Sequence, residues 1–332
     1  MTKKLIPILI LLLLLSACTG NPTAQETTPA TEAVETTAPT EATEALLADD
    51  PTEPTEQPKP TYSTGELSGD GVTLRVHFID VGQADCALIE CNNAFALIDA
   101  GYPENGDQVV EYLAAQGVQR LNLVVGTHPH GDHIGGLPAV LKAYPADNIW
   151  FSAIPFVNST VNDFLYAAKA QGREVQQPQP GQTFQLGDAT ITVLGPVHTN
   201  YEDVNDISLV LMIQLGEIRF LFTGDMEQIA ETDLINSGAD LRADVLKVGH
   251  HGSYSSTGYL FLRTVAPTFA VISCGRANEY GHPHSEPMSR LRDAEVIIFR
   301  TDKMYNIVAV TDGENITFTW DNTYAKPWTP ES

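Results

Sequence analysis

Short runs of alternating or helically spaced apolar residues predict strands and helices across residues 72–320. In residues 72–81, apolar and polar side chains alternate, which is typical of a strand with one buried face. Apolar side chains at helical spacing in residues 107–116 predict a helix. The same criteria predict further strands at residues 86–90, 94–98, 121–126, 149–151, 183–186, 189–194, 209–215, 218–222, 245–248, 269–273, 296–299, 307–310 and 316–320, and further helices at residues 137–144, 161–170, 226–236, 259–264 and 287–292.

Polar residues that could bind a metal or take part in catalysis follow directly after several of these strands. They are Asp80, Asp99, the histidines and aspartate of residues 128–133, Asp225, His250 and His282. Strands that alternate with helices, with polar clusters where strands end, indicate a layered α/β fold with one cleft at the sheet edges. Many of the strands pair as hairpins, for example residues 86–90 with 94–98. These hairpins favour two mixed sheets sandwiched between helices over a single doubly wound sheet.

Residues 127–133 read Thr-His-Pro-His-Gly-Asp-His and follow a strongly apolar strand. Imidazole and carboxylate groups this close together are typical of a metal site. Pro129 favours an extended His128, so the side chains of His128 and His130 should project to the same side and reach one ion. A turn at residue 131 would let Asp132 and His133 point at a second ion. The alternative is an exposed polar loop that happens to be rich in histidine.

The first 70 residues are not globular in composition. Two lysines precede an apolar run that is too short to span a bilayer but suits a signal peptide, which we place at residues 1–18. Residues 15–18, Leu-Ser-Ala-Cys, look like a bacterial lipobox, in which Cys18 is lipidated and anchors the chain to the cell membrane. An ordinary secretory signal with a chance cysteine is the alternative. Residues 19–70 are rich in Thr, Glu and Pro and predict a disordered acidic linker.

The remaining residues, 71–332, carry 31 acidic and 15 basic side chains, which gives a formal net charge of −16. This charge argues against a long electrostatic groove for a nucleic-acid backbone. A local binding patch is still compatible with it, because two divalent cations would invert the charge inside a cleft.

The motif His128-x-His130-x-Asp132-His133 resembles the hallmark of the metallo-β-lactamase-fold hydrolases. Further motifs look like the branch typified by the hydrolase domain of ComEC-type competence proteins, at residues 78–85, 97–101, 222–225, 246–253 and 280–284. The resemblance covers about residues 72–310. It implies that residues 71–332 form a four-layer αββα sandwich with a cleft for one or two divalent ions, zinc or manganese.

The resemblance also implies roles for individual residues. His128 and His130 would bind the first metal, Asp132 and His133 the second, with Asp225 bridging both and His250 completing the second. Two ions roughly 3.5–4 Å apart need such a shared carboxylate, and a hydroxide held between them would be the nucleophile. Neighbours on an extended chain point to opposite sides, so only one of His250 and His251 could be a ligand, and His250 is preferred by resemblance. Asp225 alone could also be a helix N-cap.

Residues around the cleft would support the ligands or contact the substrate. Asp99 would orient a ligand histidine, while Asp80, Gln83 and Asp85 would line the mouth. Asn205 lies near the position at which many family members carry a further first-site histidine, so it or water would complete that site. His282 could stabilise the transition state or protonate the leaving group, and His284 is a second candidate. Ser253 is either a turn residue or a hydroxyl donor to phosphate.

Together these features predict an extracytoplasmic, lipid-anchored, metal-dependent hydrolase. By analogy with the competence branch, its substrate would be a phosphodiester or nucleotide, with single-stranded DNA as one candidate. A β-lactamase or another ester or amide hydrolase is one alternative, although the absent first-site histidine argues against a β-lactamase. A non-catalytic surface protein that binds metal is the other. No protein partner is evident from the sequence.

Overall fold

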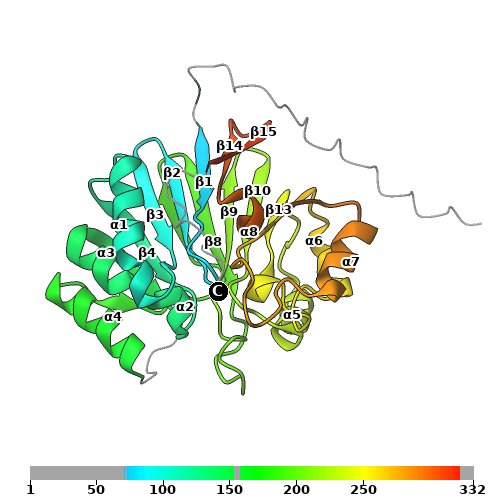
Figure 1. The fold of residues 1–332 in the computed structure, drawn as a ribbon, viewed down its shortest axis with the longest axis horizontal. Coiled ribbons are helices and arrows are strands. Elements are labelled where there is room, and N and C mark those ends of the chain that lie inside the picture. Colours follow the sequence, from blue (N-terminus) through cyan, green and yellow to red (C-terminus); the bar gives the residue numbers. More distant parts are fainter. Residues whose placement is uncertain (1–70, 72, 153–157, 322–332) are drawn as a thin grey trace, which may run out of the picture. The chain divides into compact units, whose positions relative to one another are not determined.

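The computed structural model describes residues 71, 73–152 and 158–321. These residues form two β-sheets, each with helices packed on its outer face (Figure 1). The signal peptide and linker expected in residues 1–70 lie outside the described residues. In the part of the chain that the structure describes, no helix is long and apolar enough to cross a bilayer.

Within the described residues, eight strands form the first sheet, in the order β15-β14-β1-β2-β3-β4-β5-β6. Their bounds are β1 (Leu74–Phe78), β2 (Ala87–Cys91), β3 (Ala94–Ile98), β4 (Leu121–Gly126), β5 (Ala146–Phe151), β6 (Val175–Gln176), β14 (Asn306–Thr311) and β15 (Ile316–Asp321). The second sheet has the order β13-β12-β11-β10-β9-β8-β7. Its strands are β7 (Thr183–Leu186), β8 (Ala189–Gly195), β9 (Val210–Leu215), β10 (Ile218–Phe222), β11 (Val245–Lys247), β12 (Phe269–Ile272) and β13 (Ile297–Arg300).

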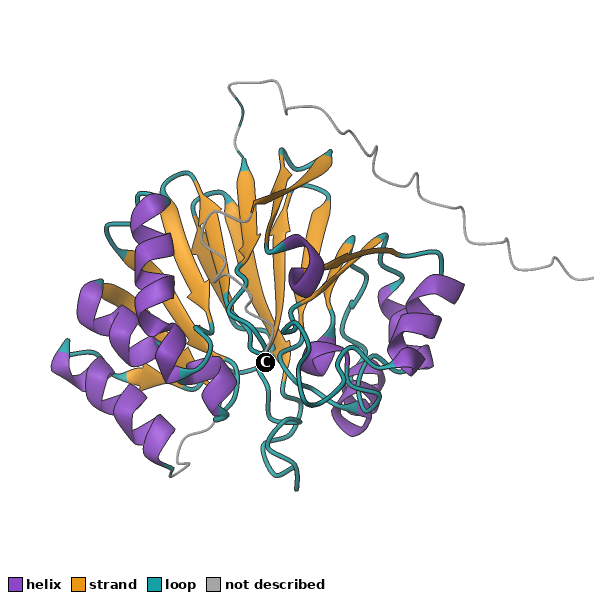
Figure 2. Ribbon diagram, viewed as in Figure 1, coloured by secondary structure: helices purple, strands orange, loops and turns teal. Residues whose placement is uncertain are grey.

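Helices separate some of these strands along the chain, and Figure 2 shows them in purple beside the orange strands. They are η1 (Pro103–Asn105), α1 (Gly106–Ala115), α2 (Gly131–Ile134), α3 (Leu137–Ala143), α4 (Ser159–Ala170), α5 (Gln228–Asn236), η2 (Gly249–Gly252), α6 (Tyr259–Val265), α7 (Ser285–Asp293) and α8 (Thr301–Met304).

The strand pairing explains where the polar loops meet. The expected hairpins β2/β3, β7/β8 and β9/β10 are antiparallel pairs. In contrast, β3, β4 and β5 pair in parallel, and so do β10, β11, β12 and β13. Parallel strands present their carboxyl ends at one edge of a sheet, so the loops that follow β3, β4, β10, β11 and β12 can share one cleft.

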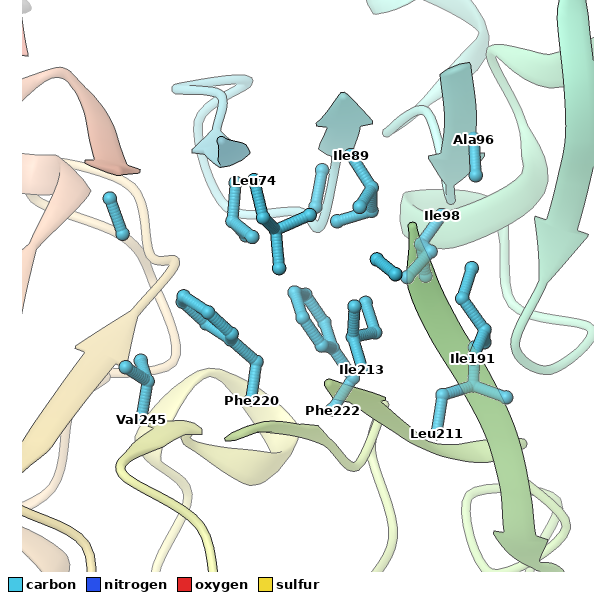
Figure 3. Packing of buried hydrophobic residues seen from close by; sticks show 14 of the residues in the cluster. Leu74, Ile89, Ala96, Ile98, Ile191, Leu211, Ile213, Phe220, Phe222 and Val245 are labelled. Carbon is cyan, nitrogen blue, oxygen red and sulfur yellow. The ribbon is translucent and has the colours of Figure 1, made fainter. Parts of the chain in front are cut away.

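The inner faces of the two sheets form the central core. Figure 3 shows side chains of both sheets pointing toward one another, including Leu74 and Ile89 from the first sheet and Phe220 from the second. The rings of Phe78 and Phe222 stack between the sheets with centroids 5.6 Å apart. Burial of each such side chain contributes about 1.5–3 kcal/mol to folding.

Two further apolar clusters attach the helices. The outer face of the first sheet packs against α1, α3 and α4, and the outer face of the second packs against α5, α6 and α7. The architecture is therefore helix, sheet, sheet, helix, which confirms the four-layer αββα sandwich predicted from the sequence (Figure 1).

The differences from the sequence-based elements are local. The helix expected from residue 226 begins at Gln228, and the helix expected from residue 287 begins at Ser285. The very short elements β6, α2 and α8 were not predicted, because segments of two to four residues carry no measurable periodicity.

Candidate metal centre

The loop after β4 brings the first two histidines together. His128 is fully buried, and the extended residue His130 precedes α2. Nε2 of His128 and Nδ1 of His130 lie 3.0 Å apart. Two imidazole nitrogens that face one another at this distance could hold one cation or share one proton. The helical turn α2, where the sequence suggested only a bend, then carries Asp132 and His133.

Asp225 lies between this pair and the second part of the cluster. It follows β10 and is almost completely buried. Its Oδ2 is 3.8 Å from Nε2 of His128, and its Oδ1 is 3.3 Å from Nε2 of His133. Two groups of possible ligand atoms, each lying within 4.8 Å of one another, contain Asp225. One group is His128, His130 and Asp225, and the other is Asp132, His133, Asp225 and His251. Asp225 therefore belongs to both groups, as a bridging carboxylate would.

The structure places His251, rather than His250, in the second group. Nε2 of His251 is 3.2 Å from Oδ2 of Asp132 and 3.6 Å from Oδ2 of Asp225. His250 contacts Oε1 of Glu227 with its Nδ1 at 3.0 Å, and its Nε2 lies 3.8 Å from Oδ2 of Asp225 without joining either group. Both histidines adopt left-handed backbone conformations, with φ of 48° and 53°. The sequence-based choice of His250 rested on resemblance, whereas in this tight turn the ring of His251 joins the group.

The outward-facing nitrogens of two ligand histidines are fixed by partners behind them. Nδ1 of His133 is 2.8 Å from Oδ2 of Asp99, which also accepts hydrogen bonds from Thr127. Nδ1 of His251 is 3.0 Å from the carbonyl oxygen of Ser273. Because a carbonyl only accepts, His251 carries its proton on Nδ1 in its neutral form. Both rings then direct an Nε2 lone pair into the cluster, which is how metal-binding histidines are oriented.

Asp85 and Lys247 form a buried ion pair behind His251. Nζ of Lys247 is 2.9 Å from Oδ2 of Asp85, whose Oδ1 is 3.3 Å from Nδ1 of His251. Sequence reasoning gave Lys247 no role, although a lysine within the apolar strand β11 is itself a signal, since lysine is almost never fully buried without a partner. Asp85, Asp99 and His133 form a third group of acidic and imidazole atoms. Asp85 thus lies buried behind His251 rather than at the mouth, where the sequence placed it, and Asp99 lies behind His133 as expected.

The charges in the cluster fit a cation. Burial lowers the pKa of His128 well below its usual value, so this ring is neutral and can donate a lone pair. Burial raises the pKa of Asp225, but the neighbouring His133 and His251 outweigh burial and hold that pKa well below its usual range. Nε2 of His133 and Oδ1 of Asp225 lie 3.3 Å apart, and within the described residues neither atom meets a hydrogen-bond partner in good geometry. Such polar atoms are costly in a protein interior unless a ligand satisfies them, so the donor set fits a divalent metal.

Gln83 and His282 meet at the mouth of the cluster. Oε1 of Gln83 accepts a hydrogen bond from the backbone N–H of Gly275 at 3.0 Å, so its Nε2 is the donor toward Nδ1 of His282, 3.1 Å away. The proton of neutral His282 is therefore on Nε2. Burial lowers the pKa of His282 to about 4, with His251 and His250 adding to the effect.

The other expected site residues lie around the cluster rather than in it. Asp80 stabilises its own turn, with Oδ1 accepting from Gly82, and its backbone N–H donates to Asn306. Ser253 contacts Ser255, which in turn donates to Glu227, the partner of His250. Nδ1 of His284 accepts from the backbone N–H of Tyr254.

Asn205 is buried and lies against the same Glu227. Its Oδ1 has no hydrogen-bond partner among the described residues. Glu227, which thus contacts His250, Ser255 and Asn205, was missed by sequence reasoning because nothing in its local pattern marks it.

Comparison with known proteins agrees with the fold. The profile of the metallo-beta-lactamase superfamily matches residues 79–276. The chain is 32% identical over 258 residues to ComE operon protein 3 of Bacillus subtilis, covering 71% of this chain and 32% of that protein. It is 33% identical over 225 residues to competence protein ComA of Neisseria gonorrhoeae, covering 67% of this chain and 30% of that protein. The chain thus spans about a third of the length of these relatives.

Among solved structures, the metallo-beta-lactamase fold protein YhfI from Bacillus subtilis aligns with a TM-score of 0.50 at 14% identity. The alignment covers 72% of this chain and 100% of that one. At this identity the likeness concerns the fold alone.

Proposed function

This chain belongs to the metallo-beta-lactamase superfamily, and on that premise we propose that it is a metal-dependent phosphodiesterase. The observation that carries the proposal is the position of Asp225, which is shared by two groups of histidine and aspartate ligands. A bound pair of divalent cations supplies Lewis-acid polarisation of a phosphoryl oxygen and a nucleophile at neutral pH. The residues that would hold them are His128, His130, Asp132, His133, Asp225 and His251.

The residues of the chain itself orient this chemistry. Asp99 and the Ser273 carbonyl fix the rings of His133 and His251, so these ligands need not reorganise during the reaction. His282 has its Nε2–H available for an oxygen of the substrate, because Gln83 occupies its Nδ1. A neutral donor next to the reacting group can stabilise developing charge or protonate the leaving oxygen. His282 is therefore the catalytic candidate outside the ligand set.

Support for a phosphodiester comes from the relatives. The name of one of them, competence protein ComA, points to nucleic acid. The net charge of −16 on residues 71–332 favours a nucleotide or a short single strand over a long duplex. We therefore place the substrate among nucleotides and short single-stranded nucleic acids, with DNA as one member of that class.

A substrate panel tests the function. Purified protein loaded with manganese or zinc is assayed with bis-p-nitrophenyl phosphate, with a short oligonucleotide and with the β-lactam nitrocefin. The expected result is turnover of the two phosphodiesters and none of nitrocefin. Turnover of nitrocefin alone would indicate a β-lactamase instead of a phosphodiesterase. No turnover of any substrate by metal-loaded protein would indicate a metal-binding protein without this activity.

The place of action is a separate part of the proposal. Residues 15–18 form the lipobox-like sequence with Cys18, followed by the acidic linker of residues 19–70. A Cys18→Ala variant is expected to move from the membrane fraction to the soluble fraction of a bacterial host that expresses the full chain. The catalytic activity of the released protein should match that of the anchored one. A variant that stays in the membrane fraction would show that Cys18 is not the anchor.

A further inference from the structure

Three tyrosines lie around the mouth of the cluster. Tyr102 precedes η1, and its ring packs over Gly131, since a Cβ at Gly131 would lie 3.8 Å from it. The side chain of Tyr280, from the opposite half of the chain, lies close to that of Tyr102 and helps to raise the pKa of Tyr102. Tyr254 follows η2, next to the histidine pair. We call Tyr102, Tyr254 and Tyr280 the tyrosine rim.

Tyr280 continues a stack of rings that begins at the cluster. The rings of His251 and His282 have centroids 6.3 Å apart and an interplanar angle of 25°. The rings of His282 and Tyr280 follow at 5.6 Å, again with an angle of 25°. His282 covers one side of the Tyr280 ring, yet 54% of the Tyr280 surface is exposed. The stack therefore ends at a ring that is about half exposed to solvent beside the ligand cluster.

Tyr254 provides a second exposed ring on the same side. It is 60% exposed, and its ring lies 5.2 Å from that of His284. The His284 ring in turn lies 4.7 Å from that of His282, at nearly a right angle. Single exposed aromatic residues need no explanation, but two held at fixed positions by the histidines of one mouth form a surface that suits a flat ligand.

We propose that Tyr280, backed by His282 and flanked by Tyr254, is the platform on which a nucleobase next to the scissile phosphodiester stacks. This inference rests on the proposed function and specifies how its substrate is recognised. Base stacking on an aromatic ring contributes about 1–3 kcal/mol per base and tolerates any sequence. An acidic domain gains little binding energy from contacts with the phosphate backbone. Stacking therefore supplies the affinity that a basic groove supplies in other nucleic-acid-binding proteins.

A binding measurement tests the platform without requiring turnover. Zinc-loaded full-length protein is titrated against a fluorescent phosphorothioate oligothymidylate and against its abasic counterpart, and anisotropy is recorded. The unmodified protein should bind the base-bearing strand more tightly. Tyr280→Ala should weaken that binding by about 5- to 150-fold, the range that corresponds to one stacked base. Tyr280→Phe keeps the ring and should retain the affinity.

Tyr166→Ala serves as the matched control, because Tyr166 is a 76% exposed tyrosine on α4 that lies outside the rim. Equal binding of the base-bearing and abasic strands, or Tyr280→Ala binding like the parent, would overturn the platform. The experiment distinguishes failure of the phosphodiesterase proposal from failure of the stacking proposal. Turnover of bis-p-nitrophenyl phosphate with equal binding of both strands would contradict only the stacking proposal. Base-dependent binding without any turnover keeps the platform and removes the phosphodiesterase.

Discussion

An Asp225→Asn variant is expected to lose phosphodiester turnover by at least about 10³-fold, equivalent to about 4 kcal/mol of transition-state stabilisation. Asp225 is the residue shared by both ligand groups, and it is almost completely buried between them. Asparagine keeps the shape but removes the negative charge that would screen two cations from one another. The turnover number with bis-p-nitrophenyl phosphate and the metal content per chain are the two measurements.

The matched control is Asp163→Asn, which makes the same change at an exposed position on α4. It should keep the activity and metal content of the parent. Circular dichroism should show that Asp225→Asn is folded, because the substitution fits the same space. A folded Asp225→Asn protein with the metal content and turnover of the parent would show that the bridging role is incorrect.

The second prediction with a large expected effect distinguishes the roles of two adjacent histidines in metal binding. His251→Ala is expected to lower metal content and to reduce turnover by roughly 10²- to 10³-fold, as expected when a residue that contacts the metal directly is lost. His251 is 3.2 Å from Asp132 and is fixed from behind by the Ser273 carbonyl. His250→Ala should keep the metal content of the parent and lose about tenfold in turnover or less, because His250 contacts Glu227.

Elemental analysis of the two purified variants, with turnover measured on the same samples, distinguishes these roles. Each variant also serves as the control for the other, since both remove one imidazole from η2. If His250→Ala lost metal while His251→Ala retained it, the assignment made from the sequence would stand and the one made from the structure would fall.

The layered fold could be predicted from the sequence because its signals are local and repeated. The hairpin of residues 209–215 and 218–222 corresponds closely to β9 (Val210–Leu215) and β10 (Ile218–Phe222). Alternating and helical periods persist over enough residues there to be recognised. In contrast, α2 spans only Gly131–Ile134, and its helical turn depends on the packing of the surrounding loops.

The candidate ligands were predictable to the extent that they are close in sequence. The spacing of His128, His130 and His133 marks them without any structure. The residue pattern alone could not decide between His250 and His251, because the direction of their side chains depends on a left-handed turn at two residues that are not glycine. The buried pair of Lys247 and Asp85 joins segments far apart in the sequence, and only the folded chain reveals it.

The most direct test of the central claim, that one histidine and aspartate cluster makes this chain a metal-dependent phosphodiesterase, is a metal titration followed by turnover. Metal-free protein is titrated with zinc or manganese while hydrolysis of bis-p-nitrophenyl phosphate and bound metal are measured together. We expect no activity without metal and a rise that saturates as the two ligand groups fill. Hydrolysis that is equally fast without bound metal, or metal-saturated protein that hydrolyses no phosphodiester, would contradict the claim.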